Sequence, residues 1–357
     1  MFGLYRTALA LVVVAHHILT VPIVGHFAVQ GFFVLSGYLM TTIMHGTYGY
    51  TLKGARGFAV NRFLRLYPLY WSILLLSSLL VASVGDEVSA GFRSAIYQPN
   101  NFLSWMQNAS LIYLDFFPGE VKPRLAPATW ALTVELLFYL LIAIGISKSR
   151  TLCLIWLVVS LVYTVATYAL VLPYDYRYSA LAAGSLPFSI GATIYFYIKP
   201  IARWLKRFRR VLHAWNCFAL IGINYLTAIL ALFYPSWLGF YTPISWLVNI
   251  ALSALVTVVL AKQGLAGISE KFDSKLGYYS YPIYLSHWGV ALFIVVVSGG
   301  AVARGLHWQG LILFLATALL STALSFLLKS AIDDPVQGIR AQVKRRLRGE
   351  VSLIQVK

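Results

Sequence analysis

The sequence predicts an all-α membrane protein with about ten transmembrane helices. Of its 357 residues, 60% are hydrophobic and only 11% are charged, whereas about a quarter of the residues in soluble domains carry a charge. A helix that crosses the bilayer needs about 20 mostly apolar residues. Ten such helices with short loops would use most of the chain, which leaves no room for a separate soluble domain.

The apolar runs recur along the whole chain. We predict membrane-spanning helices at 4–21, 27–45, 63–84, 128–147, 151–172, 180–198, 214–234, 243–261, 279–297 and 309–331. The first run resembles a signal peptide, but no small-x-small cleavage site follows it. We therefore interpret it as a retained first helix.

The basic residues give these helices an orientation. With the N-terminus in the cytoplasm, alternate loops put 23 of the 28 Lys and Arg residues inside. The five on the outside are Arg93, Lys122, Arg124, Arg177 and Arg304. Because membrane proteins concentrate basic residues in cytoplasmic loops, we predict that both termini are cytoplasmic.

The net charge of +17 follows from this topology and requires no nucleic-acid partner. The basic and aromatic cluster from Lys199 to Arg210 is expected to contact anionic membrane lipid. Residues 336–357 are expected to form a basic cytoplasmic tail. Cys153 and Cys217 lie in apolar runs without partners at ligand spacing, so neither a disulfide framework nor a metal site is predicted.

The longest outside loop, 85–127, does not fit the simple alternation. Its part near 100–117 is aromatic and only partly apolar. Such a segment is typical of a re-entrant or interfacial helix, since aromatic residues favour the headgroup level. A loop packed on the outer face and a lid over a site that opens outward are the alternatives.

Ionisable residues inside the predicted spans indicate function, because charge at membrane depth is costly. Arg6 and His17 are 11 residues apart on the first helix. They therefore share one face, about 16 Å apart along the axis. Glu135 lies about 12 Å below the outer start of the fourth span, a depth similar to that of His17. We expect the two to pair, with the carboxylate orienting the imidazole.

Arg62 and Arg65 begin the third span at i,i+3 spacing, so both guanidinium groups share one helix face at the cytoplasmic surface. They suit either phosphate binding or ordinary anchoring to the inner leaflet. His287 is expected in the ninth span, in a polar network or in catalysis. The histidines at helix ends, where exposure is expected, are His26, His45, His213 and His307.

Several runs together resemble the acyltransferase 3 family of membrane-bound O-acyltransferases. They occur in the family's order over about 280 residues: Arg6 with His17 as Arg-x10-His, 31–39 (GFFVLSGYL), 62–71 (RFLRLYPLYW), 130–139 (WALTVELLFY) and 276–287 (LGYYSYPIYLSH). One departure lies just before the second run. Many members have an acidic residue there, and this chain has Gln30 and Gly31.

The resemblance implies a transmembrane acyltransferase domain over 1–335 in the bacterial cytoplasmic (inner) membrane. It implies transfer of an acyl group, commonly acetyl, from cytoplasmic acyl-CoA to a sugar hydroxyl of a lipid-linked or exported glycan. Acyl-CoA would be a co-substrate, with no tightly bound cofactor. The chain would also associate with membrane lipid, with the glycan acceptor and with the polysaccharide synthesis machinery.

For this chain the resemblance implies that His17 and Glu135 are catalytic and that Arg6, Arg62 and Arg65 bind acyl-CoA. His17 would act as a general base or as an acyl-accepting nucleophile. The acceptor pocket or its supporting network would include Ser36, Trp130, Tyr139, Tyr284 and His287.

Two other functions are compatible with these residues. Ten helices with intramembrane His, Glu and Arg also describe a proton-coupled exporter of a small acyl compound or glycan. The sequence has no internal repeat, which argues mildly against a transporter. A structural partner of a polysaccharide synthase is a third interpretation.

Overall fold

The computed structural model describes residues 2–208 and 211–354. Within these ranges every regular element is a helix, and nine helices are long and apolar enough to cross a membrane. The 16-residue apolar helix α1 (Gly3–Ile18) is shorter than those nine. The all-α membrane fold is therefore confirmed, with α1 as the tenth apolar helix. Which face is cytoplasmic stays a prediction from the charge distribution.

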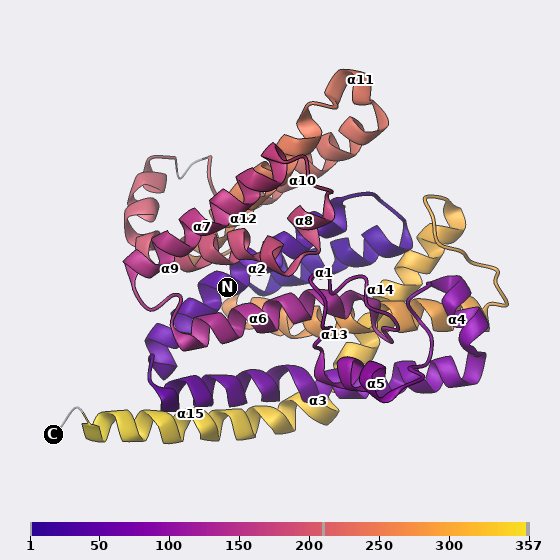
Figure 1. Ribbon diagram of the computed structural model, residues 1–357, viewed down its shortest axis with the longest axis horizontal. Helices are drawn as coiled ribbons and strands as arrows, with labels where there is room; N and C mark the ends of the chain where they lie inside the picture. The colour runs from indigo at the N-terminus through magenta and orange to yellow at the C-terminus, as the bar shows by residue number, and fades with distance from the viewer. Residues whose placement is uncertain (1, 209–210, 355–357) are drawn as a thin grey trace.

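Figure 1 shows the long helices stacked side by side. The other long apolar helices are α2 (Val24–Ile43), α3 (Leu52–Val84), α6 (Trp130–Ile144), α7 (Arg150–Ala169), α9 (Ser185–Leu205), α10 (Ala214–Phe233), α12 (Tyr241–Gln263), α13 (Glu270–Val297) and α14 (Trp308–Leu328). The shorter helices are α4 (Asp86–Phe92), α5 (Phe102–Ser110), α8 (Asp175–Tyr178) and α11 (Pro235–Leu238). The last helix is α15 (Asp334–Ile354).

Helices α1 and α13 pack closely and run in the same direction. At their beginnings, a methyl group on Gly3 would overlap the backbone oxygen of Asp273. The Asp273 carboxylate also accepts the backbone N–H groups of Gly3 and Leu4, each at 2.8 Å. Near the end of α1, His17 contacts Trp288 of α13. A carboxylate on free N–H groups stabilises a helix N-terminus, so Asp273 fixes the position of α1 and of its side chains.

Helices α2 and α9 approach each other through glycines. A Cβ atom on Gly37 would overlap the backbone of Phe188, and one on Gly191 would overlap the backbone of Val34. Small residues at crossing points let helices in membranes pack tightly. Because Ser36 is adjacent to Gly37, this contact also sets the direction in which Ser36 points.

The segment predicted near 100–117 contains the nine-residue helix α5 and then a folded loop. Nine residues are too few to cross a bilayer. Helix α5 exposes Phe102 and Leu103, while Asn108 is buried and donates to the backbone oxygen of Pro123 at 2.9 Å. The Trp71 indole donates to the backbone oxygen of Ala109 on the same helix. Helix α5 is thus a surface helix held against α3, and Asn108 anchors the loop that leads to α6.

The predicted tail is not separate from the helical bundle. A π-helical turn at Lys329–Asp333 joins α14 to α15, which lies alongside the first part of α3 (Figure 1). The Arg340 Nε donates to the Asn61 Oδ1 on α3 at 3.3 Å. Residues 355–357 of the predicted tail and Arg209 and Arg210 of the basic cluster lie outside the described residues.

Candidate active site

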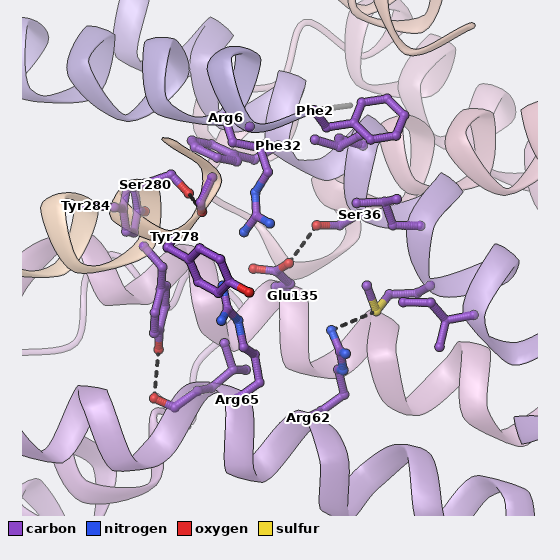
Figure 2. Close-up of a pocket in the computed structure, with 18 of the residues that line it drawn as sticks. Phe2, Arg6, Phe32, Ser36, Arg62, Arg65, Glu135, Tyr278, Ser280 and Tyr284 are labelled. Atoms are coloured by element: carbon purple, nitrogen blue, oxygen red, sulfur yellow. Dashed lines mark hydrogen bonds between the residues drawn. The ribbon is translucent and has the colours of Figure 1, made fainter. Parts of the chain in front are cut away.

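A cavity of about 780 Å³ lies among α1, α2, α3, α6, α13 and α15. Figure 2 shows its lining, with the arginines of α1 and α3 approaching from different helices. Seven of the residues singled out from the sequence line this cavity: Arg6, Ser36, Arg62, Arg65, Glu135, Tyr139 and Tyr284. The remaining three, His17, Trp130 and His287, are not among its lining residues. The structure therefore divides the predicted site into two parts.

Glu135 is the central acid of the cavity. The Ser36 hydroxyl donates to its Oε1 at 2.6 Å, and the Tyr139 hydroxyl, one helical turn along α6, donates to the same oxygen. In Figure 2 the Arg6 guanidinium points toward this carboxylate from α1. A carboxylate at this depth is therefore stabilised by two hydroxyls and a nearby cation.

The predicted pairing of Glu135 with His17 is wrong. The partners of Glu135 are Ser36 and Tyr139, and the ring neighbours of His17 are histidines and Trp288. Helix rise gave a similar depth for both residues, but depth fixes neither the rotation of a helix nor its neighbours. Arg6, which is the other end of the Arg-x10-His pattern, is the residue that lies near the carboxylate.

The cavity is rich in arginine. Arg65 forms an ion pair with Asp333 at 3.4 Å, and the Arg62 Nη1 lies 3.6 Å from the Met40 sulfur. Asp273 also lines the cavity, but its carboxylate accepts hydrogen bonds from the backbone at the start of α1. Guanidinium groups from several helices around one cavity suit a ligand with several phosphate oxygens.

Arg340 is a lining residue that the sequence did not reveal. Its Nε and the Arg62 Nη2 both donate to the Asn61 Oδ1, at 3.3 and 3.5 Å. Arg340 thus stands beside Arg62 although the two are far apart in the sequence. In the sequence it is one of many basic residues near the C-terminus, and only the packing of α15 on α3 distinguishes it.

His17 lies beyond the cavity, against α13. Its ring stacks on His287 with centroids 5.4 Å apart and planes within 6°, and it lies 4.9 Å from the Trp288 ring. The Tyr284 ring is 6.4 Å from His287 and 6.0 Å from Phe32, and both Tyr284 and Phe32 line the cavity. These two rings therefore form the boundary between the cavity and the histidine pair.

The tautomer of His287 follows from its hydrogen bond. Its Nδ1 lies 2.8 Å from the backbone oxygen of Tyr284, which can only accept. In a neutral imidazole Nδ1 must then carry the proton, so Nε2 holds a free lone pair. This Nε2 is buried and has no hydrogen-bond partner among the described residues. It is therefore able to accept a hydrogen bond from a hydroxyl or N–H group.

A row of aromatic rings extends from His17 to Trp130. Successive ring centroids are 4.8 Å apart from His17 to His16, 4.9 Å from His16 to His26, 3.8 Å from His26 to Tyr178 and 5.1 Å from Tyr178 to Trp130. The expected exposure of His26 is wrong, because its ring packs between these neighbours. The three histidines within 16–26 were the signal in the sequence.

The Tyr284 hydroxyl joins this region to the start of α6. It donates to the backbone oxygen of Ala128 at 2.7 Å. The Arg124 side chain, which is buried, donates to the backbone oxygen of Pro127 at 3.1 Å, and burial lowers the pKa of Arg124. The outer loop thus fixes the segment that precedes Trp130 and Glu135.

Comparison with known proteins identifies the family of the chain. The family model described as "Acyltransferase domain" matches residues 4–329. An alignment of 142 positions, which covers 35% of this chain, is 32% identical to the Bacillus subtilis (strain 168) protein named "Putative peptidoglycan O-acetyltransferase YrhL". That match covers 21% of the Bacillus protein, so the similarity extends over about a fifth of its length. No solved structure matches the chain. Since the family model covers nearly the whole chain, the protein belongs to this family of acyltransferases.

Proposed function

We propose that the protein transfers an acyl group, most simply acetyl, from cytoplasmic acyl-CoA to a sugar hydroxyl of a lipid-linked or exported glycan. The observation that carries the proposal is the placement of Arg6 and His17 at opposite ends of α1. Arg6 lines a cavity that is rich in arginine, and His17 stacks on His287 beyond that cavity. The name of the Bacillus relative, an O-acetyltransferase of a glycan, supports the class of acceptor.

The arginines of the cavity would hold the phosphates of the donor. Arg62 and Arg340 share the Asn61 amide oxygen as an acceptor, so both remain able to donate further N–H groups to a ligand. With the termini in the cytoplasm, this end of the cavity faces the compartment that supplies acyl-CoA. The protein would thus act in the bacterial inner membrane.

The acyl arm would extend along α1 toward His17. The rise from Arg6 to His17 is about 16 Å, of the order of an extended pantetheine arm. Tyr284 and Phe32 close the direct route in this structure, so their rings must part for the thioester to reach the histidines. Glu135 would balance the charge of Arg6 and hold the inner part of this route in place.

The chemistry at the far end follows from the imidazoles. His17 would take the proton of the acceptor hydroxyl as the oxygen attacks the thioester carbonyl. The C–S bond then breaks, an ester C–O bond has formed, and the departing thiolate takes the proton back from the imidazolium. The Nε2 of His287 would accept a hydrogen bond from the sugar and so orient it.

A reconstituted assay tests the proposal. Inverted vesicles that contain the protein receive labelled acetyl-CoA and a glycan acceptor, and the label in the glycan is measured. We expect transfer to disappear in His17→Ala and Glu135→Gln. The matched control is His213→Ala, because His213 precedes α10 and lies outside both the cavity and the ring row.

The outcomes separate the alternatives. Unchanged transfer in His17→Ala would refute the role of His17. Movement of an acyl compound across the vesicle membrane without covalent modification would instead identify a carrier. An acyl-histidine trapped with donor alone would replace the general-base step with the nucleophilic route.

A further inference from the structure

Two arginines lie against the Trp288 ring beside the His17 and His287 pair, and neither lines the cavity. The Arg93 guanidinium carbon lies 5.2 Å from the centroid of the Trp288 ring, and that of Arg304 lies 4.7 Å from it. The same ring is 4.9 Å from His17. Arg93 follows α4 and Arg304 lies between α13 and α14, so separate parts of the chain bring both cations to this place.

Neither cation is neutralised by an acidic side chain in the described part of the chain. Arg304 donates to two backbone oxygens, that of His17 at 2.9 Å and that of Phe92 at 3.2 Å. The Arg93 Nε is buried and has no hydrogen-bond partner within 2–208 and 211–354. Burial and the nearby Arg93 lower the pKa of Arg304, as expected for like charges in proximity. An arrangement of this kind is stabilised when an anion binds near both cations.

Other polar atoms here also lack partners. The Trp288 Nε1 and the His287 Nε2 have none within the described residues, although both side chains are almost fully buried. The indole N–H can only donate, while this imidazole nitrogen accepts. Buried polar atoms without partners are unfavourable, so a ligand that offers both an oxyanion and a hydroxyl would satisfy the set.

We propose that Arg93 and Arg304 form a binding site for an oxyanion, a carboxylate or phosphate, carried by the acceptor glycan. The proposal rests on the proposed function and narrows its acceptor to an anionic sugar. The site lies beside His17, so an anion held by the arginines brings the hydroxyl on the same or the next sugar to the histidines. The arginines of the cavity serve the donor, and these two serve the acceptor.

A binding experiment tests the site without relying on transfer. The full chain is placed in nanodiscs of zwitterionic lipid, and its thermal unfolding is followed with a glucuronic acid oligosaccharide or with its uncharged methyl ester. We expect the acid alone to raise the midpoint in the wild type. In Arg93→Gln the affinity for the acid should fall at least about tenfold, the effect of losing one charge-assisted hydrogen bond.

The matched control is Lys122→Gln, which removes one cation from an exposed position in the same outer loop. It should bind the acid as the wild type does. Arg93→Gln breaks no hydrogen bond of Nε to any residue that the structure describes. Arg304→Gln gives a second measurement with the same expected direction.

A transfer assay with the same two acceptors adds the kinetic readout. In the wild type the acid should have the lower KM. In Arg93→Gln the two KM values should converge, whereas Lys122→Gln should keep the wild-type difference between them. Equal binding of acid and ester by the wild type, or an undiminished preference in Arg93→Gln, would overturn the proposal. So would stabilisation that depends on anionic lipid, because the site would then hold a headgroup. Charge-dependent binding without transfer in the wild type would refute the proposed function and support the oxyanion site.

Discussion

Replacement of Arg340 by Gln tests whether α15 belongs to the donor site. Arg340 lines the cavity and shares the Asn61 amide oxygen with Arg62. The substitution removes one positive charge and keeps a polar side chain. We expect the KM for acetyl-CoA to rise while kcat changes little, because the phosphates are bound equally in the ground state and the transition state.

The magnitude follows from the position of the charge. A guanidinium about 5 Å from one phosphate charge contributes about 3 kcal/mol at an effective dielectric constant of about 20. Arg340 is only partly buried, so solvent and salt reduce this value to about 1–2 kcal/mol. The KM should therefore rise about 5- to 30-fold, and the difference from the wild type should shrink as ionic strength increases.

The control is Arg345→Gln on the same helix. Arg345 is exposed and is not among the residues that line the cavity, so its loss changes the overall charge equally without removing a ligand contact. Acetyl-CoA titrations with both variants at low and high salt decide the matter. An equal rise of KM in both variants would refute a specific contact and leave only a general field effect.

Three further predictions concern packing and the central acid. Gly3→Ala should lower the free energy of unfolding by about 1–3 kcal/mol, because the new methyl group would overlap the backbone of α13. Gly222→Ala is the control, since open space surrounds Gly222, and it should leave the thermal midpoint in detergent unchanged or higher. Tyr139→Phe removes one of two hydroxyls on Glu135, so kcat for acetyl transfer should fall about tenfold or more at unchanged donor KM; an unchanged kcat would exclude this role. Asn108→Ala should open the loop before α6 to limited proteolysis in detergent, and equal cleavage of wild type and variant would show that another contact holds it.

Part of the site was accessible from the sequence because it depends on one helix at a time. Arg6 and His17 lie on the single helix α1, and Arg62 and Arg65 share α3, as their spacing requires. The intramembrane position of Glu135 also singled it out, because a carboxylate there needs partners. The predicted partner was wrong, since Ser36 and Tyr139, and not His17, donate hydrogen bonds to the carboxylate.

The amino-acid sequence alone determined the membrane fold, the ten apolar helices and the faces on which polar residues lie. The free energy of transfer into lipid depends on each apolar segment separately, and helical periodicity is fixed by backbone geometry. Only the tertiary structure decided that Arg340 joins the cavity and that Tyr284 separates it from His17 and His287. These relations depend on how each helix is rotated against its neighbours. That rotation is set by contacts such as the one between Gly3 and Asp273. These two residues are about 270 positions apart, so no local sequence pattern reveals their contact.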